Sequence, residues 1–352
     1  MDINDEIKKL EEEIKNTPYN KATEHHIGKL KAKLARLKEK SKKGKAKGHG
    51  FFIKKSGDAS VAMIGPPSVG KSTLLNRLSN ANSKVGNYDF TTTRIIPGMM
   101  EYKGCKIQLI DMPGIIYGAS AGKGRGKEII AMARVVDLIL IVVDIHTINE
   151  IERIKEELYN AGIRINEKKP DIVIKKKDRG GINIEFAKKC RLSHETAKAI
   201  IMEYMSNADV IIRDDVNDEQ LIDAILGNRA YLPAFVVVNK IDLENIWVRC
   251  NMDVVYISAK NGIGINELKK KIFEELDLIR VYMSPDGKKI EEKPMVLKRG
   301  ATIKDVCIKL HKDFLKNFRY AIVNGSSASF KNQRVGLHHV LEDGDIVTIV
   351  AR

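Results

Sequence analysis

Short hydrophobic runs with the length of buried β-strands recur along the middle of the chain, and each is followed by polar residues or glycine. The runs lie at 60–64, 105–110, 135–145, 234–238 and 254–257. Segments with apolar residues at helical spacing, such as 73–78, separate them. Continuous apolar strands that alternate with helices are typical of a mostly parallel sheet with helices on both faces. We therefore predict an α/β fold for this part of the chain.

The N-terminal residues have a different pattern, with apolar positions at the spacing of amphipathic helices. These positions are Ile3, Ile7, Leu10, Ile14, Ile27, Leu30, Leu34 and Leu37. The polar segment 16–20 separates the two sets, contains Pro18 and predicts a turn. Residues 1–50 are therefore predicted to form a helical hairpin and a glycine-containing linker.

Residues 146–230 separate two of the apolar runs by far more chain than one crossover helix needs, so we predict an inserted α+β domain. The turn chemistry at 175–181 predicts a β-hairpin. The predicted elements are strands at 172–174 and 182–184 around this turn, a helix starting at Ser193, a strand at 210–212 and a helix capped by Asp218.

After residue 280 the chain alternates strands and turns around one helix. Thr302 and Asp305 have the spacing of a capping box, which predicts a helix start. The apolar positions of this helix that we expect to face inward are Ile303, Val306 and Leu310. Strands are predicted at 280–283, 295–297, 320–323 and 345–350. This order is typical of a β-grasp module, for which we predict docking and no catalysis.

Charge narrows the possible partners. The 352-residue chain has a net charge of +15 and a pI near 9.4, which favours nucleic acid or an acidic membrane surface. Residues 29–47 contain ten Lys or Arg and a single acid, Glu39. This segment is predicted to bind phosphate groups, or else to be a solvated helix face. No membrane is expected, because the apolar run 135–145 is too short to cross a bilayer and contains Asp137 and Asp144.

Cysteine usage and the N-terminal residues indicate the compartment. The cysteines at positions 105, 190, 250 and 307 form no C-x-x-C pair, which argues against a disulfide framework or a zinc site. The first 50 residues are highly charged and do not resemble a secretory signal. We therefore predict a cytoplasmic protein in a reducing compartment.

The candidate chemistry begins at the end of the first apolar run. The segment 65–72, Gly-Pro-Pro-Ser-Val-Gly-Lys-Ser, matches G-x-x-x-x-G-K-[ST], a loop whose backbone N–H groups bind phosphate at a helix N-terminus. The predicted nucleotide contacts are Gly65, Pro66, Ser68, Val69, Gly70, Lys71, Ser72 and Thr73. Lys71 is predicted to reach the β- and γ-phosphates and act in catalysis, and the Ser72 hydroxyl to bind Mg²⁺. The sequence thus predicts a nucleoside triphosphate site.

Two later segments can sense the γ-phosphate. One of the threonines 91–93 can give a hydroxyl to Mg²⁺ and an N–H to the γ-phosphate, and spacing leaves the choice among them open. Asp111 ends the run 105–110, so its carboxylate can join the Mg²⁺ shell. The Gly114 N–H can meet the γ-phosphate during catalysis. These contacts would be present with the triphosphate and lost after hydrolysis.

The segment Asn239-Lys240-Ile241-Asp242 predicts specificity for guanine. The Asp242 carboxylate can accept from both N1–H and the 2-amino group of guanine, a pair that adenine lacks. Lys240 is expected to cover the base, and Asn239 to tie the loops together. Ser258, Ala259 and Lys260 follow the last run, where the Ala259 N–H can meet guanine O6. GTP and GDP are therefore the predicted nucleotides.

These motifs resemble those of the developmentally regulated GTP-binding protein (Drg) family, Obg-related translation-factor-class GTPases with a C-terminal TGS domain. The resemblance covers essentially the whole chain and rests most on Phe90-Thr91-Thr92, Asp111–Gly114, Gly122–Gly126 and the insertion near 175–181. It implies that Thr92 is the catalytic, Mg²⁺-binding threonine. It also implies that the insertion has a fold found in a small-subunit ribosomal protein, and that ribosomes and a small zinc-finger-type regulatory protein are partners.

The predicted domain organisation follows from these assignments. The P-loop GTPase domain is interrupted by the inserted domain and flanked by the hairpin and the TGS domain. The predicted boundaries are 1–50 for the basic hairpin and linker, 51–164 and 231–280 for the two GTPase segments, 165–230 for the inserted domain and 281–352 for the TGS β-grasp domain.

Hydrolysis is predicted to be slow, because Ile115 stands where many GTPases have the Gln that orients the attacking water. Lys123 or Arg125 could offset transition-state charge, or could face solvent or RNA. Some relatives with a hydrophobic residue at this position use K⁺ together with an Asn in the phosphate loop. Ser68 holds that position here, which leaves a potassium requirement open.

Two functions are compatible with these residues. We predict a monomeric GTPase switch that acts on the ribosome or RNA in translation or ribosome-related processes. The alternative is an RNA-binding scaffold in which the nucleotide is mainly structural. Intact Lys71, Ser72, Thr92 and Asp111 favour the switch, since a structural nucleotide does not need them.

Overall fold

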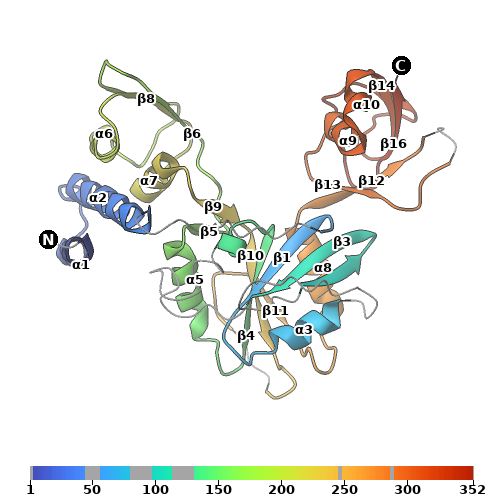
Figure 1. Cartoon of the computed structure of the whole chain (residues 1–352), viewed down its shortest axis with the longest axis horizontal. Helices are drawn as coiled ribbons and strands as arrows, with labels where there is room; N and C mark the ends of the chain where they lie inside the picture. The colour runs from blue at the N-terminus through green and yellow to red at the C-terminus, as the bar shows by residue number, and fades with distance from the viewer. Residues whose placement is uncertain are drawn as a thin grey trace. The chain divides into compact units, whose positions relative to one another are not determined.

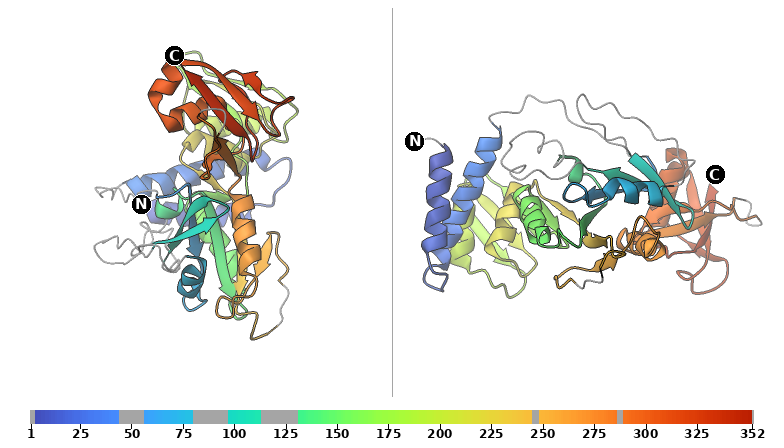
Figure 2. Two further views of the ribbon diagram at one scale, coloured as in Figure 1. Left: turned by 90° about the vertical axis from the view of Figure 1, so that its right-hand side faces the viewer. Right: turned by 90° about the horizontal axis from the view of Figure 1, so that it is seen from below.

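The computed structural model describes residues 3–43, 56–79, 97–112, 131–244, 248–285 and 289–351. The chain forms two compact units, the first made of residues 1–51 and 159–231 and the second of residues 52–158 and 232–352. Figures 1 and 2 show the elements of both units. Both units contain chain from before and after residue 158, so neither is one continuous segment.

The second unit contains a six-stranded sheet in the order β11-β10-β4-β1-β3-β2 (Figure 1). Its strands are β1 (Ala59–Ile64), β2 (Pro97–Tyr102), β3 (Cys105–Asp111), β4 (Leu138–Asp144), β10 (Ala234–Asn239) and β11 (Val254–Tyr256). All neighbouring strands are parallel except β2, which is antiparallel to β3. The predicted α/β fold with a mostly parallel sheet is confirmed.

Helices lie on both faces of this sheet. On one face, α3 (Lys71–Leu78) and α8 (Ile265–Glu275) share a core cluster with alternate strand positions, among them Val61, Met63, Leu138, Leu140, Val142, Phe235 and Val237. On the other face, α5 (Glu150–Asn160) buries Ile151, Ile154 and Leu158 (Figure 1). The strands are apolar at nearly every position because both faces of the sheet are covered.

The C-terminal part of this unit is a five-stranded sheet in the order β13-β12-β16-β14-β15. Its elements are β12 (Leu278–Met283), β13 (Met295–Lys298), α9 (Ile303–Leu310), α10 (Lys312–Lys316), β14 (Phe318–Asn324), β15 (Gln333–Val335) and β16 (Ile346–Ala351). The first and last strands, β12 and β16, pair in parallel at the centre, as in a β-grasp fold. Helix α9 packs on one face of the sheet and buries Ile303, Val306 and Cys307.

The start of α9 follows the sequence prediction. Thr302 and Asp305 form the capping box, in which the Thr302 N–H donates to Asp305 Oδ2 at 2.7 Å. The prediction that Leu310 faces inward is wrong, because its side chain is 38% exposed. Leu310 is the last residue of α9, where the chain already turns toward α10, and Cys307 fills the core in its place.

The first unit begins with the predicted helical hairpin, made of α1 (Ile3–Asn16) and α2 (Glu24–Lys43). The two helices lie side by side (Figure 2). Asn20 organises the turn between them, since its side-chain oxygen accepts from the N–H groups of Ala22 and Thr23. Leu10 and Ile27 are buried, which explains the apolar spacing read from the sequence.

The inserted domain contains a three-stranded sheet in the order β6-β8-β7. Its elements are β6 (Ile172–Lys176), β7 (Ile182–Phe186), α6 (His194–Met202), β8 (Ala208–Ile212) and α7 (Asp218–Leu226). The predicted hairpin of β6 and β7 is wrong, because β8 lies between them, antiparallel to β6 and parallel to β7. Ala208, Val210 and Ile212 of β8 are buried against the helices, and this apolar strand takes the centre of the sheet.

The two helices of the insertion have different N-caps. Ser193 caps α6 as predicted, accepting from the Thr196 N–H. Helix α7 is capped by Asn217 and not by Asp218, because the Asn217 side chain and Gln220 form a reciprocal capping box. A sequence with adjacent Asn and Asp gives no reason to choose between them.

The hairpin and the insertion share one core. Ala32 of α2 is fully buried in the cluster that contains Ile200 of α6. A Cβ atom on Gly28 would lie 2.9 Å from Thr196 Cγ2, so this glycine permits close approach of the two helices. Tyr204 Oη donates to the Ala32 carbonyl at 2.9 Å. Residues 1–43 therefore pack with the insertion and do not stand apart from it.

Tertiary contacts also neutralise much of the basic segment 29–47. Lys31 binds Asp218 at 2.9 Å, and the other ion pairs are Lys29–Glu203, Lys33–Glu6 and Lys38–Glu11. Arg36 donates to the Glu203 carbonyl. The premise that ten charges here are uncompensated is wrong for the four lysines, whereas the carbonyl bound by Arg36 carries no formal charge. The acidic partners of these lysines lie far away in the sequence, where a local charge count does not see them.

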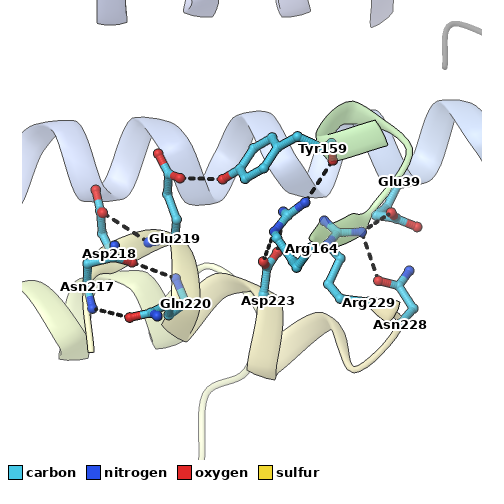
Figure 3. A network of polar contacts seen from close by, with 10 residues as sticks. All are labelled: Glu39, Tyr159, Arg164, Asn217, Asp218, Glu219, Gln220, Asp223, Asn228 and Arg229. Carbon is cyan, nitrogen blue, oxygen red and sulfur yellow. Dashed lines mark hydrogen bonds and ion pairs between the residues drawn. The ribbon is translucent and has the colours of Figure 1, made fainter. Parts of the chain in front are cut away.

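The first unit contains a buried ion-pair network (Figure 3). Asp223 of α7 accepts from Arg164 Nε at 2.6 Å, Arg164 Nη2 at 3.0 Å and Arg229 Nε at 2.7 Å. Arg229 also binds Glu39 of α2 at 3.2 Å. We call Glu39, Arg164, Asp223 and Arg229 the Asp223 cluster. Arg164 lies in β5 (Ile163–Ile165) and Arg229 directly precedes β9 (Ala230–Leu232), the two paired strands at which the chain enters and leaves the insertion.

Candidate nucleotide-binding site

The phosphate loop leaves the carboxyl end of β1, and its glycines are required by close contacts. A Cβ atom on Gly65 would lie 1.9 Å from the Val142 carbonyl oxygen of β4. Gly70 has a φ of +92°, and a Cβ there would lie 2.5 Å from Asn239 Nδ2. Only glycine avoids both the steric clash at the first position and the left-handed strain at the second. The loop is therefore fixed by the sheet before α3 begins.

Lys71 is the first residue of α3 and folds back over the loop. Its Nζ donates to the carbonyls of Gly65 at 3.0 Å and Pro66 at 2.7 Å, and the residue is 8% exposed. Burial lowers the pKa of this ammonium from its ordinary value, and the nearby Asp111 carboxylate opposes part of that shift. An ammonium bound only to backbone carbonyls can exchange them for the stronger charge of a phosphate.

Ser72 and Asp111 meet at the phosphate end of the site. Ser72 Oγ donates to Asp111 Oδ2 at 2.6 Å, although the two residues come from the start of α3 and the end of β3. A hydroxyl and a carboxylate at this distance are hard oxygen ligands that fit one Mg²⁺ ion. Among the residues that the structure describes, no group of three or more His, Cys, Asp or Glu could hold a metal. Protein sites for Mg²⁺ use one or two such groups plus phosphate oxygens, so a two-residue set suffices.

Asn239, the last residue of β10, joins the phosphate loop to the segment 258–260, which is predicted to bind the base. Its Nδ2 donates to the Val69 carbonyl at 2.8 Å, and its Oδ1 accepts from the Ala259 N–H at 2.9 Å. The side chain is buried, with 3% of the residue exposed. One amide therefore spans the two ends of the candidate site. In this structure the Ala259 N–H, expected to meet guanine O6, is already engaged by Asn239.

Lys240 is held by a residue that the sequence reading passed over. Its Nζ binds Asp144 Oδ2 at 2.6 Å, and Asp144 ends the neighbouring strand β4 directly beside Asn239. Desolvation works against the charged Asp144 carboxylate, but hydrogen bonds from Lys240 and Thr147 overcome it and lower the pKa of Asp144. The signal in the sequence is an Asp at the end of an apolar run, the same kind of position that Asp111 holds.

The other residues predicted to bind the base differ in exposure. Asp242 and Lys260 are exposed, and Ser258 is fully buried. Ser258 Oγ accepts from the Asn261 N–H at 3.2 Å and so shapes the loop. In the phosphate loop, Val69 is fully buried, while Ser68, Ser72 and Thr73 are exposed. The structure thus brings together the predicted contacts from the phosphate loop, β3, β10 and the segment 258–260.

Several predicted residues lie outside the described part of the chain. They are Thr91, Thr92, Thr93, Gly114, Ile115, Lys123 and Arg125. The roles assigned to them, including those of Thr92 and Gly114 at the γ-phosphate, stay predictions. No helix among the described residues is long and apolar enough to cross a membrane.

Family comparisons agree with this architecture. Residues 60–177 match the family described as 50S ribosome-binding GTPase, and residues 179–278 match the C-terminal region of that domain. Residues 279–351 match the TGS domain. The fold and the site therefore define a GTP-binding GTPase with a C-terminal TGS domain.

Relatives from different organisms align over essentially the full chain. The chain is 53% identical to a GTP-binding protein of Methanocaldococcus jannaschii, covering 100% of this chain and 94% of that one. It is 45% identical to developmentally-regulated G-protein 3 of Arabidopsis thaliana, covering 99% of each chain. It is 43% identical to developmentally-regulated GTP-binding protein 1 of Xenopus laevis, covering 98% of each chain. The chain belongs to the developmentally regulated GTP-binding protein family.

A solved structure of a GTP-binding protein from Pyrococcus horikoshii aligns with 83% of this chain and 100% of its own length. The sequence identity is 16% and the TM-score 0.41. These values are too low to support any further statement. The family assignment rests on the sequence relatives and the domain matches.

Proposed function

We propose that this GTPase is a Mg²⁺-dependent switch whose GTP and GDP states differ in affinity for the ribosome or another RNA. The observation that carries the proposal is the 2.6 Å contact between Ser72 Oγ and Asp111 Oδ2. This contact puts the end of β3 within reach of whatever occupies the phosphate loop. Bound Mg²⁺ would neutralise charge between the β- and γ-phosphates. The residues after Asp111 would then respond to the presence of the last phosphate.

The chain's own residues divide the work in this proposal. Lys71 would leave the Gly65 and Pro66 carbonyls and bind the β- and γ-phosphates. Ser72, Asp111 and Thr92 would supply oxygen ligands to the metal ion. Asp242 would select guanine, and Lys240, fixed by Asp144, would cover the base. The Gly114 N–H would bind the γ-phosphate as charge develops on it.

The RNA part of the proposal rests on charge and on the family description. A net charge of +15 favours a polyanion, and the family that matches residues 60–177 is described as ribosome-binding. Exposed basic residues outside the ion pairs of α2 include Lys40, Lys175, Lys176 and Arg179. We further propose a cytoplasmic location, since the four cysteines are free thiols, and a monomeric state. The family resemblance supports a small zinc-finger-type regulatory protein as an additional partner.

Co-sedimentation with ribosomes tests the switch. The protein should pellet with ribosomes more strongly in one nucleotide state when a non-hydrolysable GTP analogue is compared with GDP. Ser72→Ala should abolish the difference, while Ser79→Ala, the same change at the far end of α3, should preserve it. Equal pelleting of the wild-type protein in both states would favour the scaffold alternative.

Hydrolysis assays test the catalytic part. We expect slow intrinsic turnover of about 10⁻⁴ to 10⁻² s⁻¹, as for unassisted GTPases, and its loss when Mg²⁺ is chelated. Comparing buffers with K⁺ and Na⁺ resolves the potassium question left by Ser68. Turnover above about 1 s⁻¹ without a partner would show that the attacking water is positioned internally, contrary to the proposal.

A further inference from the structure

Arg77, in the last turn of α3, contacts the base-binding loop. Its Nε donates to the Ala259 carbonyl at 3.1 Å, and its Nη2 donates to the Lys260 carbonyl at 2.5 Å. One guanidinium thus holds two successive peptide carbonyls in the fork geometry that arginine favours. The helix that starts with Lys71 and Ser72 at the phosphate end is therefore tied at its other end to the loop for the base.

The loop that Arg77 holds is a tight turn with its own internal bonds. The Ser258 N–H donates to the Ile263 carbonyl at 3.1 Å, and the Gly262 N–H to the Ser258 carbonyl at 2.8 Å. Gly262 has a φ of +79°, and a Cβ on it would lie 3.9 Å from Arg77 Cζ. These bonds close the turn, whereas the contacts of Arg77 fix the direction of its peptides.

The two contacts of Arg77 also determine the direction in which a backbone N–H of the loop points. In a trans peptide the C=O and N–H of one unit point in opposite directions. Because the Ala259 carbonyl points to Arg77, the Lys260 N–H of the same peptide points away from α3. Within the described residues this N–H donates to no acceptor, while the Ala259 N–H is given to Asn239 Oδ1. Lys260 therefore offers an uncommitted backbone donor next to Ala259.

We propose that Arg77 is a positioning residue for guanine recognition. It orients the loop so that the Lys260 N–H, which follows the Ala259 N–H in the chain, meets guanine O6. The inference rests on the proposed guanine site. The competing explanation is structural, since a cation in the last turn of a helix is stabilising by itself. A structural role would affect all nucleotides equally, whereas the positioning role affects only those with an oxygen at position 6.

A cycle of protein and ligand changes separates these roles. The ligands are GDP and 2-aminopurine riboside 5′-diphosphate, which keeps the 2-amino group but has hydrogen in place of O6 and no N1–H. The loss of N1–H is common to wild type and variant and cancels in the cycle. Competition titrations against labelled GDP give the affinity of each. We expect Arg77→Ala to weaken GDP about tenfold, from the loss of hydrogen bonds that orient the donor, and to leave the 2-aminopurine nucleotide unchanged. Arg77→Lys should be intermediate, because one ammonium cannot form the two-pronged contact.

Arg153→Ala, which removes an exposed arginine from α5, is the matched control and should change neither affinity. Unfolding midpoints verify that each variant is folded, and Arg77→Lys carries the test if Arg77→Ala is not. An equal loss for both ligands, or no loss for either, would overturn the positioning role while leaving GTP binding intact. A wild-type protein that fails to prefer GDP over the 2-aminopurine nucleotide would overturn the guanine site and this inference together.

Discussion

The nucleotide site and the Asp223 cluster use the same kinds of side chain in different ways. In the Asp223 cluster, both oxygens of one buried carboxylate accept from two arginines, whose side chains are 5% and 11% exposed. In the nucleotide site, Lys71 binds only backbone carbonyls, and Ser72 and Asp242 are exposed. The cluster is saturated by its own chain, whereas the nucleotide site keeps hydrogen-bonding capacity for a ligand.

The two regions differ in whether their charged groups stabilise the fold or remain available to a ligand. A buried ion network that satisfies itself has nothing left to offer a ligand, and removing one member leaves an uncompensated charge. A ligand site has donors whose present partners are weak and replaceable. Substitutions in the cluster should therefore alter stability and leave nucleotide binding unchanged, and substitutions in the nucleotide site should do the reverse.

The largest effect is expected for Asp242→Asn. An amide presents a donor to the N1–H of guanine but suits the oxidised edge of xanthine, so the preference for GDP over xanthosine diphosphate should shift by about 10⁴-fold. Because Asp242 is exposed, the free energy of unfolding of the nucleotide-free protein should change by less than about 0.5 kcal/mol. Calorimetric titration with both nucleotides checks the shift. Unchanged GDP affinity would show that Asp242 does not bind the base.

Asp223→Asn should have the opposite consequences. The substitution keeps the shape but leaves Arg164 and Arg229 without a counter-charge, so the first unit should lose about 3–5 kcal/mol of stability. Urea unfolding and hydrogen exchange of the α6 and α7 amides measure the loss, and GDP affinity should not change. Asp209→Asn, which removes an exposed partner of Lys177 in the same unit, should change the stability far less, because solvent screens this surface pair. Equal effects of the two variants would refute the special role of the cluster.

Asn239→Ala tests the amide that spans the site. It removes hydrogen bonds to the Val69 carbonyl and the Ala259 N–H, which together contribute about 2 kcal/mol. GDP affinity should fall about 30-fold, because the phosphate loop and the base loop are no longer held together. Asn261→Ala, in the base loop, serves as the control and should change affinity less than about twofold. A similar result for the two asparagines would contradict the bridging role.

The smallest effect concerns pH. The pKa of Asp144 is lowered from the ordinary value of 3.8, because hydrogen bonds from Lys240 and Thr147 outweigh desolvation. A lowered pKa in the folded state adds stability that is present above 3.8 and disappears as the pH falls through the folded-state value. Asp144→Asn should flatten the acid limb of the melting-temperature profile measured by calorimetry. Parallel profiles for wild type and variant would exclude this contribution.

Local sequence patterns were enough for the central sheet and for bringing the motifs of the candidate nucleotide site to one edge of it. Each predicted strand end carries its motif because a parallel sheet places all carboxyl ends on one edge. The error at β6 and β7 had a different origin. The turn residues 175–181 between two short strands resemble a hairpin, and only the insertion of β8 from a later segment excludes it. Long-range strand order is not encoded in the turn itself.

The ion pairs of the basic segment 29–47 likewise could not be predicted from local sequence. Local counting gives ten cations to one acid, but four of the cations form ion pairs with acids from other segments, namely Glu6, Glu11, Glu203 and Asp218. Deleting residues 1–50 would therefore also uncover the core at Ala32. Replacing Lys175, Lys176 and Arg179 by Gln is the cleaner variant for testing the salt dependence of RNA binding. If these residues contact phosphates, the slope of log affinity against log salt should fall by about 0.7 for each contact to a single strand.

By itself the sequence determined the α/β sheet, the phosphate loop and the guanine-type motifs, because these depend on short-range spacing and on the chemistry of a few side chains. Only the tertiary structure decided which charges are already paired, that the N-terminal hairpin shares a core with the insertion, and that Asp144 and Arg77 reach the base loops. The physical reason is that an ion pair or a buried contact depends on distance in space, and residues 77 and 259 become neighbours only after the chain has folded.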